Sequence, residues 1–222
     1  MNTGRVRLSH IAQPVTALGP GRRAALWTAG CALACPGCVT PQLQARDSGQ
    51  WVATADLAAH LLDLPEALDG LTLSGGEPFD QAAALAALLQ RVRAARPAWT
   101  VMAFSGYTHA QLLEAGAAQR ALLAQTDLLI DGPFRRDQPS WEPLAGSANQ
   151  RLIALTARGR IVKRQVLSES PPLANLGVGE NGAAWLIGVL SPTQREAYHQ
   201  MLPKDSTSQS KATNATPTPN EN

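Results

Sequence analysis

The chain has 222 residues, of which 45% are hydrophobic, and this is enough to bury one core of ordinary size without disulfides. Its formal net charge is +2, from 19 basic and 17 acidic residues, which gives no reason to expect a nucleic-acid ligand. No segment reaches the ~18 consecutive apolar residues of a membrane span, and the first residues do not resemble a secretion signal. We therefore expect a cytoplasmic protein that binds neither nucleic acid nor membrane.

Strand and helix signals alternate along the first two thirds of the chain. The predicted elements are, in order, strands at 5–12 and 24–29, a helix at 54–64, a strand at 70–74, a helix at 80–96, a strand at 99–105, a helix at 108–115, a short helix through Leu122 and a strand at 126–131. Asp80 and Thr108 are the expected caps of two of these helices. This alternation predicts right-handed crossovers and a mainly parallel sheet, whose loops after the strands share one rim.

The last third of the chain carries weaker signals. The predicted elements here are a strand pair at 151–156 and 161–166 joined by a turn at 157–160, an apolar run at 185–190 and a helix that begins at Ser191. From Lys204 onward almost no apolar residue occurs, which predicts a disordered tail over 204–222. We expect one domain over 1–203, with no repeat and no second domain.

All three cysteines of the chain lie in one short stretch, at Cys31, Cys35 and Cys38, directly after the strand predicted at 24–29. Thiolates are soft ligands suited to an iron–sulfur cluster or to zinc. A cubane cluster has four iron corners, so three thiolates would leave one iron free to bind a small molecule. Two other interpretations stay open at this point: a zinc site completed by a histidine such as His10, and three unrelated buried cysteines.

A second candidate loop follows the strand predicted at 70–74. Its paired glycines, Gly75 and Gly76, would let the backbone approach a ligand closely, and Glu77 supplies a carboxylate suited to an ammonium group. The alternative is a tight strand-to-helix turn in which Glu77 only stands near the first turn of the next helix. If the sheet is parallel, this loop and the cysteine loop lie on the same rim.

Taken in order, the motifs of the chain resemble those of the radical S-adenosylmethionine activating enzymes, and among them the activators of anaerobic ribonucleotide reductase. The resemblance runs over residues 19–151 and leaves an extension at 152–203. The motifs that carry it are Gly19-Pro20-Gly21 with Arg23, the cysteine triplet, Ser48-Gly49-Gln50, Leu73-Ser74-Gly75-Gly76-Glu77-Pro78, Ser105-Gly106-Tyr107-Thr108, Asp131-Gly132-Pro133-Phe134 and Gly146-Ser147-Ala148-Asn149-Gln150. Their conjunction is far more specific than any one of them.

The resemblance implies a partial, open β/α barrel of mainly parallel strands and a [4Fe-4S] cluster whose free iron chelates S-adenosylmethionine. The expected cluster ligands are Cys31, Cys35 and Cys38. The residues expected to bind the cofactors are Gly37, Cys38, Val39, Gly75, Gly76 and Glu77. Of these, Gly75, Gly76 and Glu77 would receive the methionine amino group, while the backbone on either side of Cys38 would approach the adenosyl half. No catalytic side chain is expected beyond this site.

The activity that the resemblance implies is that of an oxidoreductase, a glycyl-radical enzyme activase. One electron from reduced flavodoxin or ferredoxin would cleave S-adenosylmethionine, and the 5′-deoxyadenosyl radical would abstract a hydrogen from the α-carbon of a glycine in a partner. The large subunit of anaerobic ribonucleotide reductase is the first expected partner. Two alternatives stay open: a different glycyl-radical enzyme or peptide substrate, and a non-catalytic iron–sulfur or zinc-binding interaction module.

Two positions depart from the family pattern. Ala145 stands where an arginine usually precedes the Gly-Ser-Ser-Asn-Gln motif, so any contact of that arginine is either missing or supplied by Arg151. Thr40 stands where an asparagine often follows the last cysteine. Both departures bear on the identity of the partner more than on the radical chemistry. Asp131 and Asn149 have two interpretations, contact with a ligand or partner and bracing of their own loops.

Overall fold

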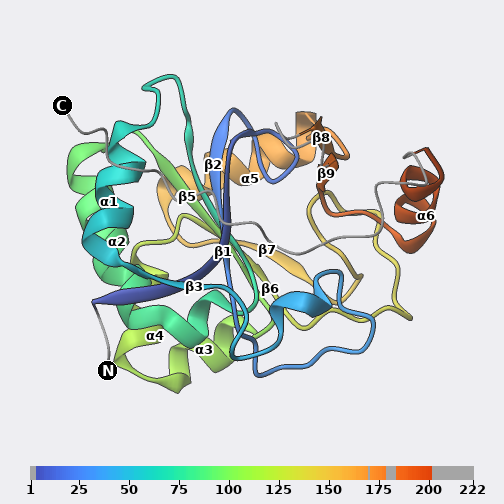
Figure 1. The fold of residues 1–222 in the computed structure, drawn as a ribbon, viewed down its shortest axis with the longest axis horizontal. Helices are drawn as coiled ribbons and strands as arrows, with labels where there is room; N and C mark the ends of the chain where they lie inside the picture. The colour runs from blue at the N-terminus through green and yellow to red at the C-terminus, as the bar shows by residue number, and fades with distance from the viewer. Residues whose placement is uncertain (1–3, 170, 179–183, 202–222) are drawn as a thin grey trace.

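The computed structural model describes residues 4–169, 171–178 and 184–201. Within them the chain forms an open seven-stranded sheet in the order β3-β1-β2-β4-β5-β6-β7 and a separate pair, β8-β9 (Figure 1). The strands are β1 Arg5–Val15, β2 Arg23–Thr28, β3 Gln50–Ala53, β4 Gly70–Gly75, β5 Thr100–Ser105, β6 Leu128–Asp131, β7 Arg151–Ala154, β8 Asn175–Val178 and β9 Ala184–Ile187. The helices are α1 Thr54–Asp63, α2 Ala82–Ala95, α3 His109–Ala115, α4 Ala117–Ala124, α5 Ala157–Glu169 and α6 Pro192–Met201, with short 3-10 helices η1 Pro41–Leu43 and η2 Pro78–Gln81.

The centre of the large sheet is parallel, as predicted. β2 pairs with β4, β4 with β5 and β5 with β6, all in parallel. Antiparallel strands flank this centre, with β1 and β3 on one side and β7 on the other. The predicted α/β class with an open, mainly parallel core is therefore confirmed.

Helices cover both faces of the parallel strands (Figure 1). Along β5, Val101 and Ala103 belong to the core shared with α1, α2, α3 and α4, while Met102 points to the opposite face and packs with α5. This alternation follows from the two-residue period of a strand and explains why the strand is apolar on both sides. The β8-β9 pair adds a small third cluster, in which Ile187 packs with Val15.

A closed set of polar contacts lies at the amino ends of the parallel strands. Arg23, the first residue of β2, is fully buried. Its guanidinium donates to Thr72 Oγ1 at 2.7 Å and to the carbonyl oxygens of Leu71 and Thr100 at 2.8 Å. Burial lowers the pKa of Arg23 to about 10, so this side chain still carries its charge at neutral pH.

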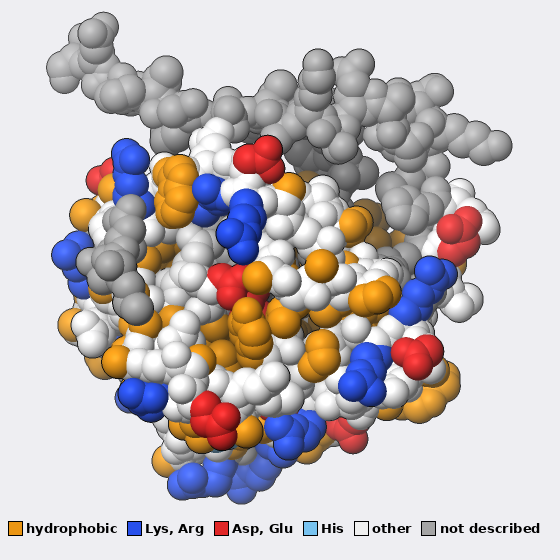
Figure 2. All heavy atoms as spheres, turned by 90° about the horizontal axis from the view of Figure 1, so that it is seen from below, with side chains coloured by type: hydrophobic (Ala, Val, Ile, Leu, Met, Phe, Trp, Pro, Cys, Tyr) orange, Lys and Arg blue, Asp and Glu red, His pale blue; other side chains and the backbone are white. Residues whose placement is uncertain are grey.

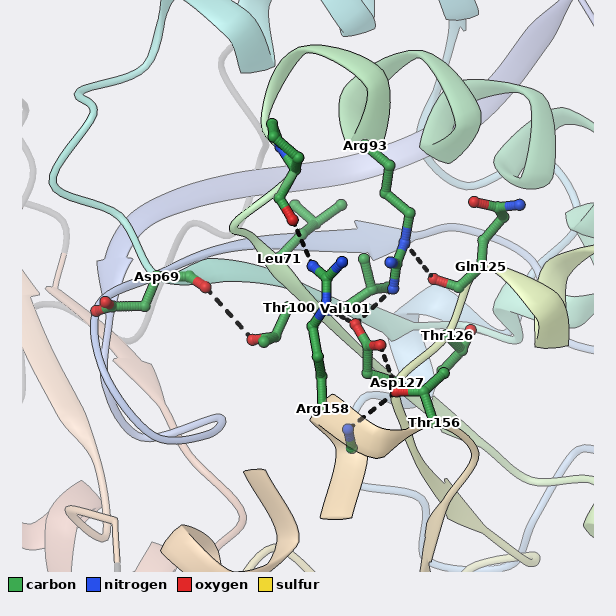
Figure 3. Close-up of polar contacts among 12 residues, drawn as sticks. Asp69, Leu71, Arg93, Thr100, Val101, Gln125, Thr126, Asp127, Thr156 and Arg158 are labelled. Atoms are coloured by element: carbon green, nitrogen blue, oxygen red, sulfur yellow. Dashed lines mark hydrogen bonds and ion pairs between the residues drawn. The ribbon is translucent and has the colours of Figure 1, made fainter. Parts of the chain in front are cut away.

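Asp127, directly before β6, is the second centre at this end of the sheet (Figure 3). Its buried carboxylate accepts from the Arg93 guanidinium at 2.5 Å, from the Val101 N–H at 2.8 Å and from the Thr156 hydroxyl at 2.6 Å. We call the contacts of Arg23 and Asp127 together the amino-end network. Charged groups in this network are paired or hydrogen-bonded, as buried charges must be.

Residues 157–169 form the helix α5 where the sequence predicted a turn and the second strand of a pair, so that prediction was wrong. β7 pairs with β6 instead of with a following strand. In α5 the buried residues are Gly159, Val162 and Val166, which recur at helical spacing. Gly159 lies so close to the Asp127 carbonyl that a Cβ would overlap it. A short apolar run fits the helical period and the strand period equally well, so the sequence pattern alone does not distinguish the two structures.

The three capping predictions had different outcomes. The capping box at Thr108 is confirmed, as is the one at Ser191, whose hydroxyl accepts from the Gln194 N–H at 3.2 Å. The predicted cap at Asp80 was wrong, because Glu77 caps the preceding turn η2 and the Asp80 carboxylate has other partners. No helix in the described part of the chain is long and apolar enough to cross a membrane. The tail predicted to be disordered, 204–222, lies outside the described residues.

Candidate functional site

The three cysteines lie on the loop between β2 and η1, at the carboxyl end of a central parallel strand. They are free thiols, each partly exposed, at Cys31, Cys35 and Cys38. The N–H groups of Gly30 and Cys31 donate to the carbonyl oxygens of Leu43 and Gln44 at 2.8 and 3.1 Å. The loop is thus pinned at its start to the segment that follows it, while its middle stays accessible.

The Gly-Gly-Glu loop packs directly against the start of the cysteine loop. The Gly76 N–H donates to the Thr28 carbonyl at 2.7 Å, and the Glu77 N–H donates to the Gly30 carbonyl at 3.0 Å. A Cβ on Gly75 would overlap the backbone of Thr28, and a Cβ on Gly76 would overlap the backbone of Gly30. Both glycines are therefore required for the two loops to meet, whatever ligand binds beside them.

Glu77 is 1% exposed and is held by three donors of the chain itself. Its Oε1 accepts from the Phe79 N–H and the Ser105 hydroxyl, both at 2.9 Å, and its Oε2 accepts from the Gly106 N–H at 2.8 Å. Burial raises the pKa of this carboxyl to about 7. Glu77 therefore braces the loops after β4 and β5, and its predicted contact with an ammonium group stays a prediction.

Asp80 and Tyr107 extend this brace to the cysteine loop. The Asp80 carboxylate accepts from the Ala32 N–H at 3.2 Å and from the Tyr107 hydroxyl at 3.0 Å. Burial and the neighbouring Asp80 carboxylate raise the pKa of Tyr107 to about 12, so its hydroxyl stays a donor at neutral pH. Sequence reasoning missed both roles: it assigned Asp80 only as a helix cap and counted Tyr107 only as part of the Ser105-Gly106-Tyr107-Thr108 motif.

The remaining predicted residues of the cysteine loop face outward. Gly37 is exposed and lies against the Arg136 side chain, and Val39 is 46% exposed. Thr40 turns inward, where its N–H donates to Cys38 Sγ and its hydroxyl donates to the Gly75 carbonyl, both at 3.4 Å. The residue that departs from the family pattern here thus links the last cysteine to the Gly-Gly-Glu loop.

Asp131 braces the loop at the carboxyl end of β6. Its buried carboxylate accepts from the His109 N–H at 2.7 Å, at the start of α3, and from Arg151 Nη2 at 2.5 Å. The Arg151 side chain is itself 59% exposed. Of the two interpretations of Asp131, the structure shows the bracing contacts.

Asn149 braces the same region and keeps one polar atom free. Its Nδ2 donates to the Pro133 carbonyl at 2.7 Å, and the adjacent Gln150 donates to the Gly132 carbonyl at 2.9 Å. Asn149 Oδ1 is the one buried side-chain nitrogen or oxygen within the described ranges that lacks a hydrogen-bond partner. An unpaired buried acceptor at this rim suits a site that a ligand completes.

The donor set of this rim fits an iron–sulfur cluster with a small-molecule ligand. The loop offers three soft sulfur ligands, and the sequence holds no fourth cysteine. In the part of the chain that the structure describes, no three His, Cys, Asp or Glu side chains are grouped closely enough to hold a single metal ion. A cluster does not need such a group, since each thiolate binds a different iron. Burial raises the pKa of Cys31, so metal binding there must displace a proton.

Comparisons with known proteins agree with this chemistry. The 4Fe-4S single cluster domain family matches residues 17–153. The anaerobic ribonucleoside-triphosphate reductase-activating protein of Vibrio cholerae is 37% identical over 145 residues, which cover 62% of this chain and 91% of that protein. The proteins of the same name from Escherichia coli K12 and Enterobacteria phage T4 are 34% and 30% identical, with 60% and 62% of this chain and 88% and 87% of those proteins covered.

Among solved structures, a crystal structure of QueE from Escherichia coli matches 47% of this chain and 54% of that chain, with a TM-score of 0.39 and 14% identity. The family match covers more than half of this chain and includes all three cysteines and the Gly-Gly-Glu loop. On this basis the chain belongs to the 4Fe-4S single cluster domain family of radical S-adenosylmethionine enzymes.

Proposed function

We propose that this radical S-adenosylmethionine enzyme is a glycyl-radical enzyme activase whose partner is anaerobic ribonucleoside-triphosphate reductase. The observation that carries the proposal is the loop with three thiols, bonded through Gly30 to the Gly-Gly-Glu loop at the carboxyl rim of a parallel sheet. The choice of partner is supported by the relatives, which carry the name of activating proteins for that reductase and are matched over 87–91% of their length.

The proposed cluster ligands are Cys31, Cys35 and Cys38. We place the methionine end of S-adenosylmethionine at Gly75, Gly76 and Glu77 and the adenosyl end at the backbone of Gly37 and Val39, because these residues flank the cysteines on the same rim. When bound, the cluster and S-adenosylmethionine supply reductive cleavage of a sulfonium and abstraction of a hydrogen atom from a partner glycine.

The role of the chain itself is to hold three loops together. Glu77 fastens the loop after β4 to Ser105 and Gly106 after β5, and Asp80 fastens the cysteine loop to Tyr107. These bonds link the cysteine loop, the loop after β4 and the loop after β5 to one another. A preorganised site of this kind spends no binding energy on loop ordering when its ligands arrive.

Three further assignments belong to this proposal. The electron donor is reduced flavodoxin or ferredoxin. The compartment is the cytoplasm, where thiols stay reduced. Residues 1–203 form one domain, which is supported by the packing of the β8-β9 pair onto β1: Asn175 Oδ1 accepts from the N–H groups of Thr16 and Ala17 at 2.9 and 2.8 Å.

A second candidate keeps the radical chemistry but directs it to another glycyl-radical enzyme or a peptide. It is supported by the elements that lie beyond the family match at 17–153, namely α5, β8, β9 and α6. Such an extension could recognise a different partner from the one that the shorter relatives serve.

The test is to purify the protein without oxygen, load iron and sulfide, reduce it and add S-adenosylmethionine and the reductase. We expect 5′-deoxyadenosine from the intact protein and none from a Cys35→Ala variant. We also expect the electron paramagnetic resonance doublet of a glycyl radical on the reductase. Nucleoside without the doublet would favour the second candidate. A fully loaded, reducible cluster that yields no nucleoside would contradict both.

A further inference from the structure

A groove of about 520 Å³ lies on the outer side of the cysteine loop. It is bordered by the first residues of that loop, by the strands β1 and β3, by the short helix η2 and by α4. Its lining residues that matter here are Arg7, Cys31, Arg46, Trp51, Asp80 and Gln81. Since Cys31 itself lines the groove, a protein that fills the groove contacts one of the proposed cluster ligands.

The net formal charge of the groove lining is positive, because the lining holds two cations, Arg7 and Arg46, and one anion, Asp80. The Asp80 carboxylate accepts from the Ala32 N–H and the Tyr107 hydroxyl. On the face that Figure 2 shows, apolar side chains and an acidic patch lie near the centre, and both basic and acidic side chains stand around them. The positive charge of the groove therefore comes from Arg7 and Arg46 and not from a uniformly basic face.

The groove wall is also preorganised. The Arg7 guanidinium stacks over the Trp51 ring at 4.6 Å, and Trp51 is still 50% exposed. Below it the Gln81 side chain accepts from the Arg7 N–H at 2.6 Å and donates to the Arg7 and Ala29 carbonyls at 3.0 and 3.3 Å. Arginine and tryptophan are the residues that protein interfaces favour, and here they stand on a rigid strand edge.

We propose that this groove, which we call the Arg7–Arg46 groove, is the docking surface for an acidic one-electron carrier protein. The inference rests on the proposed function, which requires a single electron from outside. One electron passes from the reduced carrier, which is oxidised by one electron, to the oxidised cluster, which is reduced by one; no covalent bond forms or breaks. Electron-transfer encounters are small and transient, and opposite charges increase their association rates.

A second groove on the other side of the loop, of about 670 Å³, provides a contrast. It is lined by Pro36, Phe134, Arg135, Arg136 and Asp137 and by none of the cysteines. Its arginine pair is as basic as that of the Arg7–Arg46 groove, so it provides a matched control of equal charge. Arg136 already packs on Gly37, which further separates this groove from the interior of the loop.

The experiment measures the rate at which the loaded protein is reduced, followed as bleaching of the cluster absorbance in an anaerobic stopped flow at low ionic strength. The electron donors are reduced flavodoxin, an acidic carrier protein, and photoreduced 5-deazaflavin, a small molecule that needs no docking surface. The variants are Arg7→Glu/Arg46→Glu, Arg46→Glu alone, and the control Arg135→Glu/Arg136→Glu. Arg46→Glu alone covers the case in which the double variant folds poorly.

With flavodoxin, we expect the second-order rate of the Arg7/Arg46 variants to fall about tenfold or more, and the difference from the unmodified protein to shrink as salt is added. With 5-deazaflavin, the rates should be unchanged, and the Arg135/Arg136 variant should reduce normally with both donors. An equal fall with both donors, an equal fall in the control variant, or no fall would overturn the proposal.

These outcomes are separate from a failure of the proposed function. The reduction rate is measured without S-adenosylmethionine and without the reductase. If reduction by flavodoxin depends on Arg7 and Arg46 but no 5′-deoxyadenosine forms, the docking surface stands and the activase assignment fails.

Discussion

Polar groups at the two ends of the parallel strands differ in whether the chain itself provides their bonding partners. At the amino end, Arg23 and Asp127 are buried and bonded to other groups of the chain. At the carboxyl end, the chain leaves three thiols free, and Asn149 Oδ1 has no partner within the described ranges. The first arrangement stabilises the fold, whereas the second keeps ligating groups available. In sheets of this kind, function gathers at the carboxyl end for the same reason.

From this difference between the two ends, we expect a cysteine substitution to abolish cluster binding while the stability of the chain stays nearly unchanged. Cys35→Ala should abolish cluster loading, because two thiolates do not suffice to hold the cluster. The free energy of unfolding of the metal-free chain should change by no more than about 1 kcal/mol, since Cys35 is partly exposed. Iron and sulfide analysis and urea unfolding measure the two effects. A variant that loses several kcal/mol would show that the loop also supports the core.

At the amino end the opposite result is expected. Asp127→Ala should lower the free energy of unfolding by about 3–5 kcal/mol, because the Arg93 guanidinium, the Val101 N–H and the Thr156 hydroxyl all lose their acceptor. The conservative Asp127→Asn variant should lose less, since it keeps an acceptor. Urea unfolding of the metal-free chain is the measurement. The molecules that remain folded should bind iron as the unmodified chain does.

Glu77, like Asp131, is an exception at the carboxyl end, because its carboxyl is buried and hydrogen-bonded as the groups of the amino-end network are. Its pKa is about 7 in the folded chain and about 4.5 in a solvated carboxyl, so between these values only the folded chain holds the proton. Stability from this group is therefore complete below about pH 4.5 and is lost as the pH rises through 7, by roughly 3 kcal/mol in total.

The variant Glu77→Gln should flatten this dependence. Urea unfolding of the metal-free chain, repeated at pH values from about 5 to 8, measures the slope in both proteins. An equal slope in the variant would assign the pH dependence to other groups. The measurement needs neither cofactor, so binding of the cluster or of S-adenosylmethionine does not contribute to the slope.

Much of the parallel core could be predicted from sequence, because its strands are short apolar runs bounded by glycines and its helices carry regular stripes and caps. The rest depended on tertiary contacts. The apolar residues at 161–166 fit a strand as well as a helix, and the sequence does not show that Gly159 lies against the Asp127 carbonyl, where the helix α5 packs. Asp80 read as a cap, since nothing in the sequence shows that Ala32 and Tyr107 converge on it.

The site could be predicted as a set of loops but not as a set of contacts. The three cysteines and the Gly-Gly-Glu loop share a rim, as strand order in a parallel sheet requires. Sequence reasoning assigned the paired glycines to ligand approach, whereas the structure shows that they first allow two backbones to pack. Spacing along the chain does not reveal which atoms across a sheet come within van der Waals distance.

A smaller effect is expected at the brace between the loops. Tyr107→Phe removes the hydroxyl that donates to Asp80 at 3.0 Å, in an exposed setting, and should cost about 1 kcal/mol of unfolding free energy. Its larger effect should be on the cysteine loop, which loses part of its anchor at Ala32. Hydrogen exchange of the loop amides in the metal-free chain measures this, and unchanged exchange would show that Asp80 holds Ala32 without help.

The smallest predicted effect tests whether a side chain matters to the cluster because it lies near the carboxyl rim or because of the contacts that it makes. Thr108 lies just beyond the carboxyl end of β5, where it caps the helix α3. Its hydroxyl accepts from the Gln111 N–H at 3.3 Å, and its own N–H donates to Gln111 Oε1 at 2.8 Å. Thr108→Ala should cost about 0.5–1 kcal/mol of unfolding free energy. Cluster loading, measured on the same preparation, should be unchanged. If cluster loading fell together with stability, proximity to the carboxyl rim would matter more than whether a side chain ligates the cluster or braces a loop. The difference between the two ends of the strands would then be one of location.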